Sequence, residues 1–264
     1  MYAEMASKEG APKKDTRLLR TKKKERTRNN IITEAAKLFS KRPYDDVLLE
    51  DIAEAAFISR QTLYNYFNNK EDVFFAAGNQ IYKEENEKMA EVVSSDAPGK
   101  EQIIHLCEKK FRDSTENPVL LKIIREFWDR FNSRDASSAE VYSEIIEKIG
   151  ASQLQELIEE PDLLEEFDLE KYFEEPNFIE LYIQFLRNGG MWLKAIRKGK
   201  LDDSIKNDME DMQIMQFINI LTDGVIHETM RRQSALDRIG MKRETFESNT
   251  IKLVVVFLDD RANR

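Results

Sequence analysis

The chain has 264 residues, of which 41% are hydrophobic and 34% are charged, with only nine Gly and six Pro. This composition allows one large or two unequal domains built from long helices and argues against a loop-rich sheet. The single cysteine, Cys107, excludes an intrachain disulfide and a cysteine-based metal site. Without a recognisable signal peptide or membrane-spanning run, we expect a cytoplasmic protein with no membrane partner.

Charge is unevenly distributed along the chain. The net formal charge is −9, yet residues 1–70 hold fifteen Lys/Arg against ten Asp/Glu, so the remainder is strongly acidic. Ten of these cations lie between Lys8 and Arg28, with three carboxylates among them. This polarity indicates a nucleic-acid contact at the N-terminal end, the alternative being a solvated basic tail.

The first elements are short helices. Residues 1–18 are polar and aperiodic, and we expect a disordered basic tail there. Apolar spacings of three and four then predict a helix that stops at Pro43, a second short helix from Leu49 to Ala56, and a third capped by Ser59. A long helix begins at Lys70. Three helices with a tight turn before the third form a helix-turn-helix, whose last helix enters the major groove of DNA.

Six further helical stretches follow Pro98, bounded by Pro, Gly and Asn. We therefore predict an all-α fold with a helix-turn-helix domain over residues 19–75 and a larger helical domain over 76–264 for ligand binding and dimerisation. No nucleophile, acid pair or metal set is recognisable, and both histidines are isolated. We expect no enzyme activity, metal or cofactor. The six helices are predicted near residues 100–115, 118–133, 137–159, 177–197, 202–232 and 243–262.

The third helix presents a polar face. At 100° per residue, turning Leu63 toward the core places Gln61 and Asn65 on the opposite side. Their amides can pair with adenine edges, although Gln and Asn are also ordinary solvated residues. Thr62 can contact a thymine methyl, and Arg60 can reach guanine or phosphate.

Residues 27–74 resemble the DNA-binding domain of the TetR (tetracycline repressor) family of regulators, above all in the run from Thr62 to Lys70. The resemblance implies that Tyr66 and Lys70 contact the DNA backbone. The sequence departs from the family pattern at Phe57, where Gly is usual, so Phe57 must avoid a positive φ or carry strain. It also has Leu48 where a phosphate-contacting Thr is common. The residues predicted to contact DNA are Thr27, Ser59, Arg60, Gln61, Thr62, Tyr64, Asn65, Tyr66 and Lys70.

The resemblance also implies a homodimer that binds an operator with two half-sites and a body that senses a small-molecule effector. As a set, the body aromatics are candidates to line an apolar pocket, although core packing is the favoured explanation for any one of them: Phe127, Trp128, Phe131, Tyr182, Phe185 and Trp192. Apolar stripes on the last two long helices predict the dimer interface: Ile214, Ile218, Leu221, Val225, Leu253 and Phe257.

The expected function is a transcriptional repressor released from DNA by its effector. The alternative is a DNA-binding protein whose body recruits a protein partner, as an activator or architectural factor.

Overall fold

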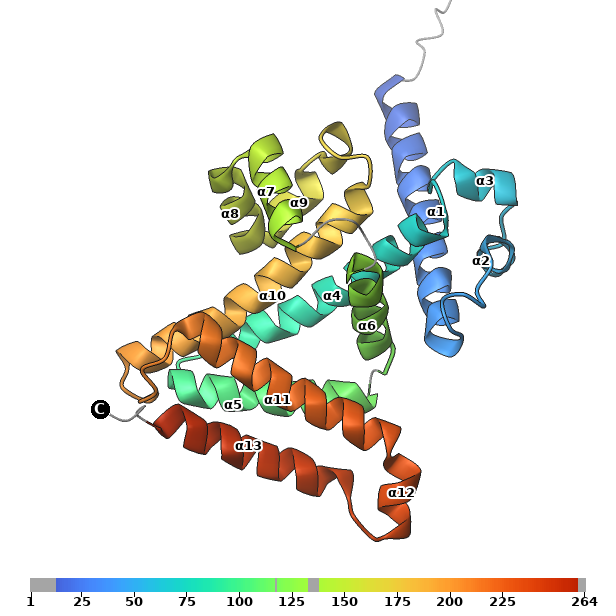
Figure 1. Ribbon diagram of the computed structural model, residues 1–264. Helices are drawn as coiled ribbons and strands as arrows, with labels where there is room; N and C mark the ends of the chain where they lie inside the picture. Colours follow the sequence, from blue (N-terminus) through green and yellow to red (C-terminus); the bar gives the residue numbers. More distant parts are fainter. Residues whose placement is uncertain (1–12, 117, 133–137, 261–264) are drawn as a thin grey trace, which may run out of the picture. The chain divides into compact units, whose positions relative to one another are not determined.

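The computed structural model describes residues 13–116, 118–132 and 138–260, and these residues contain helices and no strand (Figure 1). The all-α prediction is confirmed. The chain divides into two compact units, Met1–Phe74 and Phe75–Arg264, which we call the head and the body. No helix in the described ranges is long and apolar enough to cross a membrane.

The head begins with an unexpectedly long helix. Helix α1 spans Lys13–Lys41, so residues 13–18 of the expected tail are helical, and the rest of that tail lies outside the described residues. No Gly or Pro interrupts this stretch, so the backbone can continue the helix. The head is completed by α2 (Leu49–Ala55), α3 (Arg60–Tyr64) and the start of α4 (Lys70–Ser94).

The head has a small aromatic and aliphatic core. Ile31 and Ala35 of α1 are fully buried, as are Ile52 of α2 and Leu63 of α3. The three rings of Phe39, Tyr44 and Phe74 close the far end of this core. Phe39 stacks on Tyr44 with ring centroids 5.7 Å apart, and Phe74 meets each of them edge-on at 5.2 Å. These contacts attach the loop before α2 to the first and last helices of the head.

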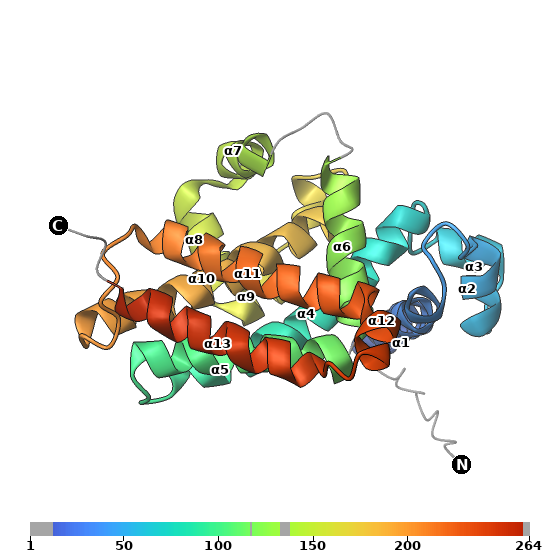
Figure 2. The same cartoon turned by 60° about the horizontal axis from the view of Figure 1, so that its bottom comes forward.

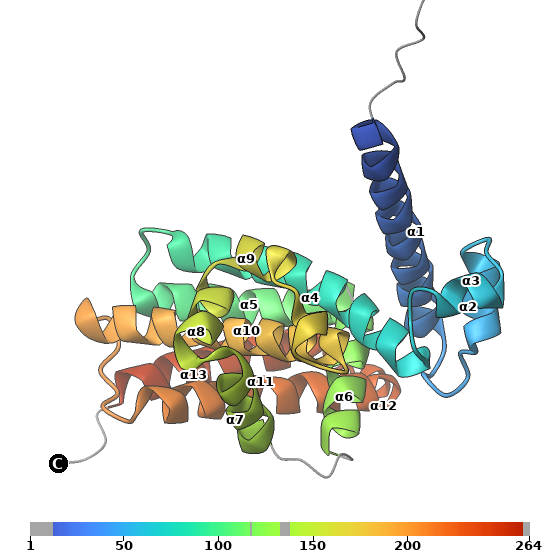
Figure 3. The same ribbon diagram turned by 90° about the horizontal axis from the view of Figure 1, so that it is seen from above.

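Helix α10 is the central element of the body and packs against α5, α8 and α11. Helix α5 lies along α10 (Figure 3), and α11 and α13 lie side by side (Figure 2). Several short helices lie between α6 and α10 in the sequence. The bounds are α5 (Gly99–Glu116), α6 (Pro118–Asn132), α7 (Ser138–Ile149), α8 (Ala151–Glu159), α9 (Pro161–Glu166), the 3-10 turn η1 (Leu169–Lys171), α10 (Pro176–Leu201), α11 (Asp211–Arg231), α12 (Gln233–Arg238) and α13 (Arg243–Asp259).

Two predicted helices are wrong in their bounds. The helix expected over 137–159 is split by Gly150, which adopts φ +88°. The helix expected over 202–232 begins only at Asp211, and α10 continues through Gly199 instead of breaking there. The segment between α10 and α11 is held in a turn by α13, because the Leu258 carbonyl accepts hydrogen bonds from the backbone N–H groups of Lys206 and Asn207.

Gly199 instead allows a close approach between helices. A Cβ atom on Gly99, at the start of α5, would lie 2.0 Å from the Gly199 nitrogen and 2.5 Å from the Ala195 carbonyl oxygen. The Gly99 N–H donates to the Asp202 carboxylate at 2.8 Å. The two glycines therefore fix how tightly α5 packs on α10.

Candidate nucleic-acid interface

Helix α3 is short and firmly positioned. The Ser59 hydroxyl oxygen accepts a hydrogen bond from the Thr62 N–H at 3.0 Å, and its backbone is extended, so Ser59 is the predicted N-cap. Leu63 is fully buried. Gln61 and Asn65 are exposed on the opposite face. Asn65 lies just past the end of α3 but keeps helical dihedral angles (φ −76°, ψ −9°), so its side chain stays on that face.

Arg60 is held at the first turn of α3. It forms an ion pair with Glu50 of α2, and its guanidinium donates to the Tyr64 hydroxyl at 3.1 Å. That hydrogen bond, followed by the charge of Glu50, raises the pKa of Arg60. Because both partners are exposed, the pair contributes little to stability. It presents a fixed cation at the edge of the polar face, and sequence reasoning missed Glu50 because nothing in the chain's local pattern pairs it with Arg60.

The turn before α3 carries backbone strain. Phe57 adopts φ +57°, the left-handed conformation that the family's usual glycine permits, and 95% of its surface is exposed. A non-glycine residue pays roughly 1–2 kcal/mol for this conformation. The sequence analysis left two possibilities for Phe57, and the structure shows the strained one.

Lys70 and Thr27 are partly occupied within the head. The Lys70 ammonium donates to the Tyr44 carbonyl at 3.0 Å and lies 4.2 Å from the centroid of the Tyr44 ring. An ammonium has three donors, so a further hydrogen bond to phosphate remains available. The Thr27 hydroxyl donates to the Lys23 carbonyl at 3.0 Å, which leaves it only as an acceptor. A phosphate contact from Thr27 would require its hydroxyl to rotate.

Leu48 is exposed at the start of α2 and supplies no polar cap. Its backbone N–H instead donates to the Asp51 carboxylate at 3.1 Å, and Arg42 donates to the same oxygen at 2.8 Å. The hydrogen bond from Leu48 lowers the pKa of Asp51, with Arg42 adding to the effect. The first turn of α2 is therefore capped by Asp51 from within the helix, without the hydroxyl of the Thr that is common at position 48 in the family.

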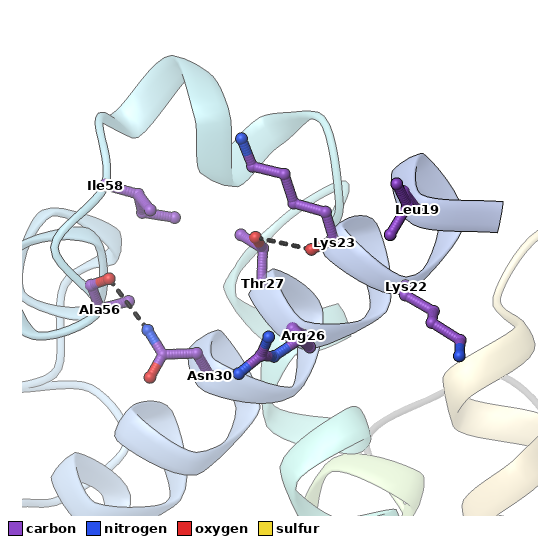
Figure 4. A pocket seen from close by; sticks show the side chains of 8 residues that line it. All are labelled: Leu19, Lys22, Lys23, Arg26, Thr27, Asn30, Ala56 and Ile58. Carbon is purple, nitrogen blue, oxygen red and sulfur yellow. Dashed lines mark hydrogen bonds between the residues drawn. The ribbon is translucent and has the colours of Figure 1, made fainter. Parts of the chain in front are cut away.

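A hollow lies between the N-terminal half of α1 and the turn that precedes α3 (Figure 4). The Asn30 amide closes one side of it by donating to the Ala56 carbonyl at 3.0 Å. Sequence reasoning anticipated the cations of α1 but not Asn30, Ala56 or Ile58, because only folding brings residues 26 positions apart into contact. Its lining residues are Leu19, Lys22, Lys23, Arg26, Thr27, Asn30, Ala56 and Ile58.

Four of the six residues predicted to line the effector site lie in one aromatic cluster. Phe127 is fully buried, with its ring centroid 4.6 Å from Phe185 and 5.9 Å from Phe131, and Phe131 stacks on Tyr182 at 5.8 Å. Trp192 lies two turns further along α10, in a second core with Cys107. The side chain of Trp128 lies outside the described residues. Burial raises the pKa of Cys107 to about 12, so this thiol stays protonated and unreactive.

The predicted dimer residues divide into two groups. Ile214 and Ile218 are fully buried in the core of their own subunit, so their assignment to the interface is wrong. Leu221, Val225 and Phe257 are half-buried, and Leu253 is 57% exposed. The exposed apolar face of α11 and α13 instead consists of Phe217, Ile220, Leu253 and Val256.

The head is a helix-turn-helix DNA-binding domain: a buried Leu63 and a capped α3 hold polar side chains on an exposed face, beside fixed cations. Residues 31–77 match the family model described as bacterial regulatory proteins, tetR family. This stretch of the chain is therefore similar to the DNA-binding domain of TetR-family transcriptional regulators. The sequence matches no curated protein.

Solved structures share the fold over most of the chain. A regulator from Saccharomonospora viridis in complex with choline is 15% identical, with a TM-score of 0.61 over 87% of this chain and 96% of that one. FadR from Bacillus subtilis in complex with stearoyl-CoA is 16% identical, with a TM-score of 0.55 over 86% and 97%. A TetR/AcrR-family regulator from Thermobifida fusca is 16% identical, with a TM-score of 0.51 over 86% and 96%. At these identities the similarity concerns the fold.

Proposed function

We propose that this protein represses transcription as a homodimer that binds two operator half-sites through α3 and leaves them when a small effector binds the body. The exposed pair Gln61 and Asn65, opposite the buried Leu63, carries the DNA-reading part of this proposal. Among the other predicted contacts, Ser59 caps α3 at its N-terminus, and Arg60, Thr62 and Tyr64 lie within the helix. Tyr66 and Lys70 follow it.

Site selection from random duplexes tests DNA reading. Gln61→Ala and Asn65→Ala should each cost about 1–3 kcal/mol at particular base pairs of the selected operator. Lys70→Ala should weaken all sequences alike and flatten the salt dependence. Gln155→Ala, an exposed amide of the body, is the control. Binding as tight as wild type by the folded double variant Gln61→Ala/Asn65→Ala would refute the assignment of the reading face.

The dimer is proposed on the exposed apolar face of α11 and α13. Ile220 is 72% exposed and Val256 66%, and a Cβ on Gly224 would meet nothing within 4 Å in its own subunit. Such a face is costly in water and suits a two-fold helical interface. Ile220→Asp should produce a monomer in sedimentation, whereas Ile214→Val, in the subunit core, should leave the dimer intact. A wild-type monomer at micromolar concentration would refute the interface.

The effector is proposed to enter among the body aromatics around Phe127 and Phe185. The choline and stearoyl-CoA complexes of two structural neighbours suggest a cation and an acyl thioester as first probes, since aromatic faces attract cations and apolar chains. A ligand releases DNA only if it prefers the conformation that does not bind DNA. Helix α4 is continuous from head to body and can transmit that preference to the spacing of about 34–36 Å between recognition helices.

Titration of the protein with such probes tests this step. Fluorescence of Trp192 should change with ligand, and the same ligand should weaken operator binding. Phe185→Leu should weaken the ligand effect, while Phe167→Leu, a ring stacked on Tyr172 outside this cluster, should not. A bound ligand that leaves DNA affinity unchanged would favour the alternative in which the body recruits a protein partner.

A further inference from the structure

Helix α1 extends far beyond the core of the head. Its first fully buried side chain is Ile31, and every described side chain from Leu18 to Arg26 is exposed. At 1.5 Å per residue, residues 18–26 form roughly 13 Å of helix outside the core. This extension gains nothing from burial, so the helix propagates into it from the anchored residues.

The extension concentrates positive charge on a rigid element. Residues 18–26 contain five Lys/Arg and one carboxylate. Several cations repeat at helical spacing, among them Arg20 with Lys24 and Lys22 with Arg26, so like charges face one another along the helix. Among the residues that the structure describes, no carboxylate pairs with Lys22, Lys23 or Arg26. An extended polyanion alongside would relieve this repulsion along its whole length.

These cations border the hollow of Figure 4, where the side chains of Lys22 and Lys23 extend to different sides of α1. Leu19, Ala56 and Ile58 provide its apolar surface. Ile58 directly precedes Ser59, the N-cap of α3, so the hollow continues the polar reading face. Cations around an apolar surface match the chemistry of a sugar-phosphate strand, which alternates charged phosphates with apolar deoxyribose faces.

We propose that the N-terminal extension of α1 and this hollow bind the DNA backbone that flanks each half-site, with Lys22, Lys23 and Arg26 pairing with its phosphates. The inference rests on the proposed operator binding and lengthens the footprint beyond the bases that α3 reads. Cations spread over roughly 13 Å of helix fit a duplex better than a small anion, which would engage only one or two of them.

The test compares the full-length triple variant Lys22→Gln/Lys23→Gln/Arg26→Gln with wild type on the selected operator. Each phosphate contact contributes about 0.9 to the slope of log affinity against log salt. Because each of the two protomers loses three contacts, we expect the magnitude of that slope to fall by about 5, with base preferences unchanged and backbone protection lost only at the flanks. Lys88→Gln/Lys171→Gln/Lys194→Gln removes three exposed body cations and should leave the slope unchanged. The conservative variant Lys22→Arg/Lys23→Arg keeps all three positive charges and should have the same salt dependence as wild type.

The outcomes separate this inference from the proposed function. An unchanged slope in the α1 triple variant, or an equal loss in the body control, would overturn the backbone contact while leaving operator recognition by α3 in place. A wild-type chain that binds no duplex would refute both. Since all three α1 side chains are exposed, the variant should fold as wild type, and circular dichroism checks this.

Discussion

Placing a methyl group on Gly99 should separate α5 from α10. In the native packing that carbon would lie 2.0 Å from the Gly199 nitrogen and 2.4 Å from its Cα, whereas nonbonded carbon contacts need roughly 3.5 Å. The obstacles are backbone atoms of a helix, so no side-chain rotation relieves them. The helices must move apart by more than 1 Å, roughly, before the contact becomes tolerable.

The expected cost follows from what that movement breaks. Overpacking alone typically costs about 1–3 kcal/mol. The N–H of Gly99 also loses alignment with Asp202, and that of Lys100 with the Ser204 hydroxyl at 3.0 Å, which adds about 1 kcal/mol for each bond. We expect Gly99→Ala to lower the free energy of unfolding by roughly 3–5 kcal/mol, a large share of the roughly 5–15 kcal/mol typical of proteins.

Urea denaturation of the full chain, followed by tryptophan fluorescence, measures this loss. Gly190→Ala is the matched control, because it lies within α10 and a Cβ there meets nothing within 4 Å. It should stabilise the helix by about 0.5–1 kcal/mol. A cost below about 1 kcal/mol for Gly99→Ala, judged against typical overpacking, would show that the two helices are not held at this distance.

Three further substitutions test single features. Phe57→Gly should raise stability by roughly 0.5–1 kcal/mol, since relief of the left-handed backbone outweighs the added chain entropy, and Phe57→Ala should show no such gain in the urea midpoint. Lys109→Met leaves the half-buried carboxylates of Glu85 and Asp113 without their shared ammonium and should cost about 3–5 kcal/mol at pH 7. Burial raises the pKa of Glu85, so this loss should shrink as pH falls toward 5. Asp202→Asn should destabilise at neutral pH. Hydrogen bonds from Ser204 and Gly99 lower the pKa of Asp202, so the difference in melting temperature should begin to shrink as pH drops below about 4 and be lost as pH falls through the lowered pKa of the folded state.

The sequence by itself determined the elements whose signals are local. Ser59 was predictable as an N-cap because its hydroxyl bonds to an N–H only three residues away. Leu63, Gln61 and Asn65 were placed on opposite faces of α3 by helical geometry alone, and the structure has them so. The conflict between a non-glycine residue and a positive φ at Phe57 was also visible in the sequence, because φ is a property of one residue's backbone.

Only the tertiary structure decided which apolar surfaces meet inside one subunit. Helix α11 is apolar on more than one side, so its spacing pattern could not distinguish the buried Ile214 and Ile218 from the exposed Phe217 and Ile220. The same holds for Gly199, which a local rule treats as a helix breaker but which a neighbouring helix requires. Burial and close approach depend on partners distant in sequence, and the pattern of a single helix contains no information about them.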